Sequence, residues 1–145
     1  MIRLVPMTES EFRIYRAHLI REYAADKVRA GNWSAEDSLN RSEKETDQLL
    51  RQGLATIDQY LFSIYDAGLA QNVGILWFAV VHGGGKSSAF IYDIEVDAAL
   101  RGRGFGTQAL LQLEEKAKSL GLDTIGLHVF GFNRGARVLY EKLGY

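Results

Sequence analysis

The 145-residue sequence contains no cysteine, so disulfide bonds, thiolate metal ligands and a cysteine nucleophile are excluded. Its three histidines, His18, His82 and His128, lack the spacing of a metal-binding pair, and we expect no metal. The formal net charge of −1 offers no excess of positive charge, so we do not expect nucleic acid as a partner. No apolar run approaches the roughly 18 residues of a membrane span, and no signal-peptide pattern opens the chain. These absences predict a cytoplasmic protein without a membrane partner.

What is present is the composition of an ordinary globular domain, with 47% hydrophobic and 24% charged residues. A chain of this size buries roughly 70% of the surface that its unfolded form exposes, which is enough for a core without cross-links. The sequence shows no repeat, low-complexity tract or linker. We therefore expect one domain over residues 1–145.

The first third of the chain predicts a strand and two helices. Residues 2–5 form a short apolar run, and Thr8 and Glu11 have the spacing of a capping box that opens a helix. One apolar stripe of this helix recurs at helical spacing: Phe12, Tyr15, Leu19 and Tyr23.

A second, more polar helix is expected after the break at Gly31-Asn32. Ser34 is its predicted cap, and the pattern runs to about Arg51, with Gly53 just beyond its end. The residues expected on its inner side are Leu39, Thr46, Leu49 and Leu50.

Three strands joined by short turns then predict an antiparallel meander over residues 59–66, 73–82 and 88–96. The connection between the last two, 82–86, carries three glycines and indicates a hairpin turn. A helix follows from Thr107 to the predicted C′ residue Gly121, and its apolar side is expected to hold Leu110, Leu113, Ala117 and Leu120.

The last predicted elements are a strand and a helix. Because a helix precedes the strand 124–130, that strand is expected to lie parallel to 88–96. Asn133 is predicted to cap the final helix. The pattern as a whole predicts an α/β protein with a mixed sheet.

The segment 97–107 joins a strand to a helix through three glycines in five residues, the arrangement of an anion site at a helix N-terminus. A P-loop at Gly85-Lys86-Ser87 is rejected because its first glycine would fall at Val80 and a strand follows it. The dinucleotide pattern Gly104-x-Gly106-x-x-Ala109 lacks a correctly placed acidic residue and follows a meander rather than a Rossmann half.

The third motif, Arg101-x-x-Gly104-x-Gly106, resembles the signature of the GNAT superfamily of acetyl-CoA-dependent N-acetyltransferases. The stretches IEVDAALRGRGFGTQALLQLEEKAKSLG and TIGLHVFGFNRGARVLYEKLGY are similar to the core strand, loop, helix, strand and helix of that family. The resemblance covers essentially the entire chain. It implies the GNAT fold, with helices on both faces of a mixed sheet, acceptor-side helices over about 8–52 and an acetyl-CoA core over about 88–145.

The resemblance further implies that backbone amides of the loop hold the pyrophosphate of acetyl-CoA. These residues are Arg101, Gly102, Arg103, Gly104, Phe105, Gly106 and Thr107. The backbone at Ile94 and Val96 is expected to bind the pantetheine arm, and Asn133 to contact the same arm. As catalytic residues, Tyr140 matches the family tyrosine that protonates the departing thiolate, and Glu95 is the candidate base. Asp93, a water molecule and His128 remain alternatives for the base.

The implied activity is acetyl transfer from acetyl-CoA to a primary amine by direct attack, on a small-molecule or peptide acceptor. The acceptor pocket is expected among the 8–52 helices and the meander, and its candidate residues are Tyr15, Tyr23, Trp33, Glu36, Asp37 and Trp77. The alternative is a non-catalytic acyl-CoA-binding or regulatory module of the same fold. Members of the family continue into two more strands where this sequence stops at Tyr145, so we expect either a homodimer or a less stable protein.

Overall fold

The computed structural model describes residues 1–127. These residues form two compact units. One contains Met1–Pro6 and the chain from Asp58 onward, and the other is Met7–Ile57. The predicted helix from Asn133, the end of the 124–130 strand, and the candidates His128 and Tyr140 lie outside the described residues.

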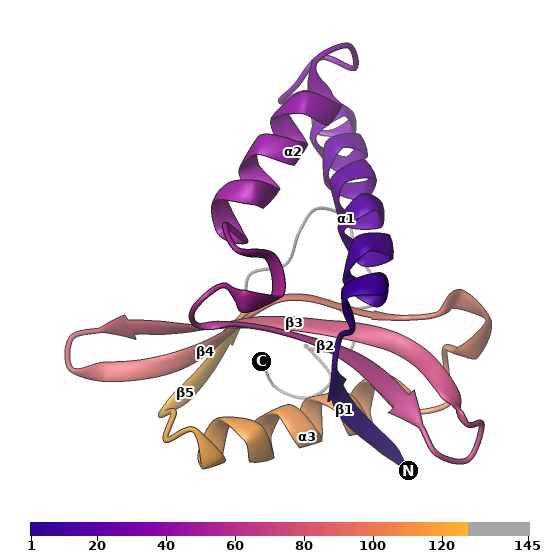
Figure 1. Ribbon diagram of the computed structural model, residues 1–145, viewed down its shortest axis with the longest axis vertical. Helices are drawn as coiled ribbons and strands as arrows, with labels where there is room; N and C mark the ends of the chain where they lie inside the picture. The colour runs from indigo at the N-terminus through magenta and orange to yellow at the C-terminus, as the bar shows by residue number, and fades with distance from the viewer. Residues whose placement is uncertain (128–145) are drawn as a thin grey trace. The chain divides into compact units, whose positions relative to one another are not determined.

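The first unit is a mixed sheet with one helix (Figure 1). Its strands are β1 (Ile2–Pro6), β2 (Gln59–Asp66), β3 (Gln71–Gly83), β4 (Lys86–Val96) and β5 (Thr124–Leu127), in the spatial order β1-β2-β3-β4-β5. Neighbours from β1 to β4 are antiparallel, whereas β4 and β5 are parallel. The helix α3 (Phe105–Ser119) provides the crossover between the two parallel strands. The predicted α/β class, meander and parallel crossover are confirmed.

Alternate strand residues and one side of α3 make the core of this unit. On β2, Phe62 and Ile64 are buried as predicted, and they belong to one cluster with Leu110 and Leu113 of α3. Leu120 was expected in this row but is 39% exposed. The reason is that α3 ends at Ser119, so Leu120 is already the C-cap and no longer follows the helical stripe.

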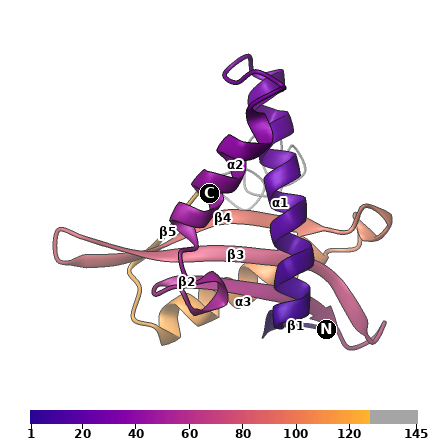
Figure 2. The ribbon, with the colours of Figure 1, turned by 45° about the horizontal axis from the view of Figure 1, so that its top comes forward.

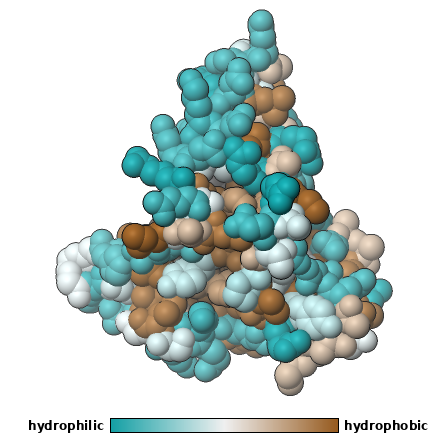
Figure 3. Space-filling view, viewed as in Figure 1, coloured by the Kyte–Doolittle hydropathy of each residue, from teal (hydrophilic) through white to brown (hydrophobic). Residues whose placement is uncertain are grey.

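The second unit is a pair of helices, α1 (Glu9–Arg29) and α2 (Ser38–Leu49). The capping box at the start of α1 is confirmed, since Thr8 Oγ1 accepts from the amide of Glu11 and Glu11 accepts from the amide of Thr8. The side of α2 that faces the viewer in Figure 3 is covered mostly by hydrophilic residues.

The predicted inner side of α2 is partly wrong. Leu39 is 55% exposed, and the buried residues of the helix are Ser38, Ser42 and Thr46, at intervals of four. Ser42 has no exposed surface, and its hydroxyl donates to the carbonyl of Ile20 on α1 at 2.7 Å. Small side chains let the two helices approach closely, and the buried hydroxyl is satisfied by a backbone acceptor. Ser34 is not the cap, because the N-cap position of α2 is Asp37.

Two glutamines of α3 cover the outer edge of β1. Gln108 Oε1 accepts from the amide of Ile2 at 3.3 Å, and Gln112 Oε1 accepts from the amide of Leu4 at 3.1 Å. The Gln112 amide also donates to the carbonyl of Ile2. Side-chain amides thus take the place of a neighbouring strand at this edge, which satisfies its backbone groups.

Replacing Gln112 with glutamate should weaken the fold more than the same change at Gln108. A carboxylate at 112 still accepts from the amide of Leu4, but it cannot donate to the carbonyl of Ile2 and places a second acceptor against it. Gln108 only accepts in its bond to β1, so a carboxylate there can keep that bond. We expect Gln112→Glu to lower the free energy of unfolding by about 1–3 kcal/mol and Gln108→Glu by clearly less. Urea unfolding of the two variants, which carry the same change in charge, measures the difference. Equal losses would contradict the donating role of Gln112.

None of the helices within residues 1–127 combines the length and the apolar character that spanning a bilayer requires.

Candidate functional site

The glycine loop, residues 97–104, connects β4 to α3. It contains a short 3-10 helix (Ala98–Leu100), after which Gly102 and Gly104 adopt φ of 81° and 83°. The helix begins at Phe105, two residues before the predicted Thr107, and Gly104 occupies the N-cap position. Because glycine has no side chain to cap the helix, the first amides of α3 remain available for an anion at the positive end of the helix dipole.

Backbone conformation, rather than crowding, is what requires glycine in this loop. A Cβ atom built on Gly102 or Gly104 meets no other atom within 4 Å, so the space beside both residues is open. Their φ values lie in the left-handed region, where any other residue is strained. Open space beside a turn of exposed amides is what a bound phosphate group needs.

The predicted phosphate-site residues differ in whether their side chains can reach a ligand. Phe105 is 8% exposed and packs in the core, so only its backbone can serve a ligand. Arg101 and Arg103 are exposed, and Nε of Arg101 donates to the carbonyl of Val96 at 3.0 Å. Arg101 therefore ties the loop to the end of β4, through one of the two backbone groups of Val96, the residue whose backbone is expected to bind the pantetheine arm.

A bulge in β4 decides where the two candidate carboxylates lie. Ile91 pairs with Phe78 and Asp93 pairs with Trp77, so Tyr92 is an extra residue between them. Before the bulge, Ala89 and Ile91 face the core with α3, and after it Ile94 does.

The bulge thereby reverses the alternation of the strand. Without it, Asp93 and Glu95 would continue the buried row of Ala89 and Ile91. With it, both lie on the face of the sheet that points away from α3. Their partners on β3 are Trp77 for Asp93 and Ile75 for Glu95. Asp93 is 7% exposed and Glu95 is half-buried. The structure thus places the two carboxylates on one face, as predicted, at the end of β4 that leads into the glycine loop.

Tyr92 is a residue of this face that the sequence patterns missed. Its ring stacks on Trp77 with centroids 4.7 Å apart, and the Trp77 indole donates to Gln59 Oε1 at 2.7 Å. The sequence gives no signal of it, because Phe90, Tyr92, Ile94 and Val96 read as one unbroken apolar row. Trp77 itself has no exposed surface.

The acceptor candidates of the helical unit form a cluster of their own. Tyr23 and Trp33 meet edge to face at 5.4 Å, and the Trp33 ring lies 5.8 Å from the Lys27 amine and 5.3 Å from the Arg41 guanidinium. Burial raises the pKa of Tyr23 to about 12, and the neighbouring Glu45 adds to this shift. The chain's own cations thus already contact Trp33. Of the other candidates, Tyr15 is buried, whereas Glu36 and Asp37 are exposed.

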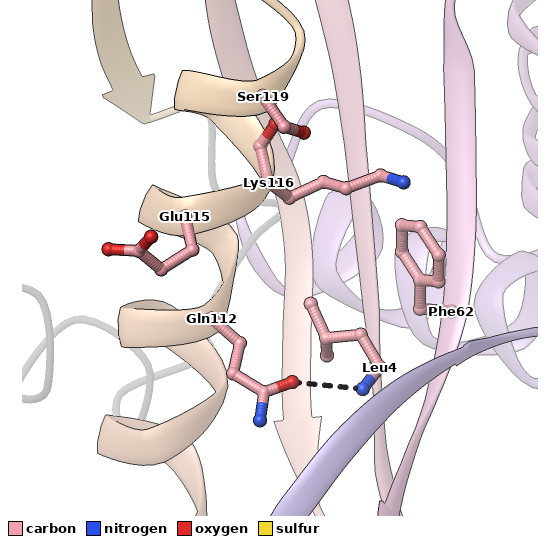
Figure 4. A pocket seen from close by; sticks show the side chains of 6 residues that line it. All are labelled: Leu4, Phe62, Gln112, Glu115, Lys116 and Ser119. Carbon is pink, nitrogen blue, oxygen red and sulfur yellow. Dashed lines mark hydrogen bonds between the residues drawn. The ribbon is translucent and has the colours of Figure 1, made fainter.

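A hollow of about 330 Å³ lies elsewhere, along the second half of α3 (Figure 4). Its lining residues are Leu4, Phe62, Gln112, Glu115, Lys116 and Ser119. The helix rises about 1.5 Å per residue, so most of this lining lies two or more turns from the glycine loop. We therefore do not assign the hollow to the candidate site. Among residues 1–127, no three histidine, aspartate or glutamate side chains are grouped so that they could hold a metal ion.

Comparisons with known proteins agree with this geometry. The sequence profile of the acetyltransferase (GNAT) family matches residues 23–145. The chain is 38% identical over 144 residues to the uncharacterized N-acetyltransferase YycN of Bacillus subtilis (strain 168). The alignment covers 99% of this chain and 92% of that protein. The uncharacterized N-acetyltransferase YdgE of the same strain is 32% identical over 143 residues, covering 98% of this chain and 90% of that protein.

Solved structures show the same fold. The crystal structure of YycN matches with a TM-score of 0.89 and covers 100% of this chain and 92% of that one. A predicted acetyltransferase from Clostridium acetobutylicum, solved with acetyl-CoA, matches in fold with a TM-score of 0.65 at 15% identity, covering 100% of this chain and 90% of that one. The matching family profile, the close relatives and the strand–glycine loop–helix arrangement have one explanation: the chain belongs to the GNAT family of acetyltransferases.

Proposed function

We propose that the protein is an N-acetyltransferase that transfers the acetyl group of acetyl-CoA to a primary amine by direct attack. The observation that carries this proposal is the glycine loop, in which two left-handed glycines and open space precede an uncapped helix N-terminus. A diphosphate fits such a site, because backbone amides and the helix dipole both favour negative charge there. The acetyl-CoA in the Clostridium acetobutylicum structure of the same fold supports this choice of donor.

In this proposal the amides from Arg101 to Thr107 hold the pyrophosphate, and the backbone at Ile94 and Val96 contacts the pantetheine arm. Asn133 contributes a further contact. The charges of Arg101 and Arg103 are solvated and screened, so the amides carry more of the phosphate affinity than these side chains do. Where the arm uses the carbonyl of Val96 rather than its amide, that carbonyl shares or exchanges the bond from Arg101.

The chemistry needs two proton transfers, one to this chain and one from it. Acetyl-CoA supplies an activated thioester, and the attacking amine must lose a proton before or during attack. Glu95 takes that proton, directly or through water, from the face of β4 that the bulge exposes. Tyr140 returns a proton to the departing thiolate. Glu95 and Tyr140 are therefore proposed as the base and the acid.

The test is an acceptor screen that follows the release of free CoA. The panel contains a polyamine, an aminoglycoside, free amino acids and a peptide with a free N-terminus. We expect amine-dependent release with at least one class, together with a product that is heavier by one acetyl group. Binding of acetyl-CoA without acetylation of any amine would contradict the proposal and favour a non-catalytic acyl-CoA-binding module.

A further inference from the structure

A second group of reactive side chains lies at the hairpin between β3 and β4. His82 and Ser87 are paired across the two strands, and Ser87 Oγ lies 2.8 Å from Nδ1 of His82. The other ring nitrogen, Nε2, lies 3.3 Å from Oδ2 of Asp58. With the ring proton on Nε2, His82 donates to Asp58 and accepts from the hydroxyl of Ser87. The three residues then form a continuous aspartate–histidine–serine chain.

The backbone holds each member of this chain in place. Asp58 has φ of 64°, an uncommon value for a residue other than glycine, and its carbonyl accepts from the amide of Val80 at 2.8 Å. The carbonyl of Ser87 accepts from the amide of Asp123 at 2.9 Å. Between His82 and Ser87, two left-handed glycines, Gly84 and Gly85, make the tight turn that sets the register of the two strands.

The group is open to small solutes and remote from the glycine loop. The side chains of His82 and Asp58 are 62% and 41% exposed. Ser87 lies near the start of β4, whereas the loop follows its end, and Val96 is nine positions further along the strand, at about 3.3 Å per position. Figure 1 shows the hairpin turn and the glycine loop at opposite ends of β4, and the turned view in Figure 2 agrees.

We propose that Ser87 is an activated nucleophile and takes acyl groups from small activated esters. In this step Oγ of Ser87 forms a bond to the acyl carbon, the bond from that carbon to the leaving oxygen breaks, and the hydroxyl proton passes to Nδ1 of His82. The imidazolium then gives this proton to the leaving group or to water. Asp58 orients the ring by accepting from its Nε2–H. A nucleophile, a base and an orienting carboxylate define this chemistry by geometry, whatever the fold.

The neighbouring serine provides a matched control. Ser88 is half-buried like Ser87, but it points to the opposite face of the strand, and its hydroxyl bonds to Thr124 Oγ1 at 2.7 Å. It therefore has the same intrinsic chemistry, but its hydroxyl bonds to a threonine rather than to an imidazole. A difference in reactivity between the two serines reports the effect of His82.

The experiment treats the full chain with p-nitrophenyl acetate in the absence of acetyl-CoA and maps the acetylated peptides by mass spectrometry. We expect acetylation of Ser87 and not of Ser88, at a rate that Ser88→Ala leaves unchanged. His82→Gln should slow the reaction about 100-fold, the usual contribution of a general base, and Asp58→Asn should slow it less.

A small alkyl fluorophosphonate, which reacts with activated serine hydroxyls by loss of fluoride, supplies a second measurement on the unmutated chain. Modification of Ser87 alone supports the proposal. No modification of Ser87 by either reagent, equal rates at Ser87 and Ser88, or an unchanged rate in folded His82→Gln would overturn it. Neither reagent involves the glycine loop, so the result is independent of the proposed acetyl-CoA-dependent function.

Discussion

Replacing Gly104 with alanine should weaken acetyl-CoA binding about tenfold or more. Gly104 holds φ of 83° at the N-cap of α3, and the left-handed conformation costs an alanine about 1–2 kcal/mol. Since the loop is exposed, the variant relaxes toward negative φ, and the ligand must then restore the strained conformation. A cost of about 1.4 kcal/mol corresponds to a tenfold change in Kd. Isothermal titration calorimetry with acetyl-CoA measures the change.

The other end of the same helix offers a matched control. Gly121 follows the C-cap of α3 with φ of 73°, and a Cβ there also meets no atom within 4 Å. Gly121→Ala therefore carries the same kind of backbone strain, and both variants should lose a similar amount of stability. Only Gly104→Ala should lose affinity. If both variants bind acetyl-CoA equally well, the loop does not hold the pyrophosphate.

The glycine loop could be predicted because its chemistry is local. The order of strand, glycines and helix is written in adjacent residues, and a positive φ is nearly specific to glycine. The meander, its hairpin turn and the parallel crossover follow from the same kind of pattern, since apolar alternation and short turns leave few topologies. The structure confirms each of these, and only the ends of the elements shift, as at the start of α3.

Features that depend on long-range packing could not be predicted in the same way. Hydrophobicity predicts leucines on the inner side of α2, but Ser42 is buried there because its hydroxyl donates to a carbonyl on another helix. Gln112 reads as an ordinary helix residue, and its role appears only when β1, more than a hundred positions earlier, lies beside it. The bulge at Tyr92 is hidden for the same reason: the even positions 90, 92, 94 and 96 read as one unbroken apolar row, and only the pairing of β4 with β3 shows the extra residue.

The bulge leads to the second prediction of large effect. Because it turns Asp93 and Glu95 to the face of the sheet opposite α3, either carboxylate could accept the proton of the amine. Their burial separates the two roles: Asp93 is 7% exposed, whereas Glu95 is half-buried and closer to the glycine loop along the strand. A base must reach the acceptor or its water, so we expect Glu95 to act in catalysis and Asp93 to support the structure.

Glu95→Gln should lower kcat by about 100- to 10,000-fold, the range typical for loss of a general base, with unchanged affinity for acetyl-CoA. Asp93→Asn keeps the size and shape of its side chain and should change the free energy of unfolding far more than kcat. Steady-state kinetics, acetyl-CoA titration and urea unfolding on both variants separate these effects. The reverse pattern would assign the base to Asp93. A kcat that neither substitution changes would mean that no carboxylate of β4 takes the proton, and would leave water and His128 as the remaining candidates for the base.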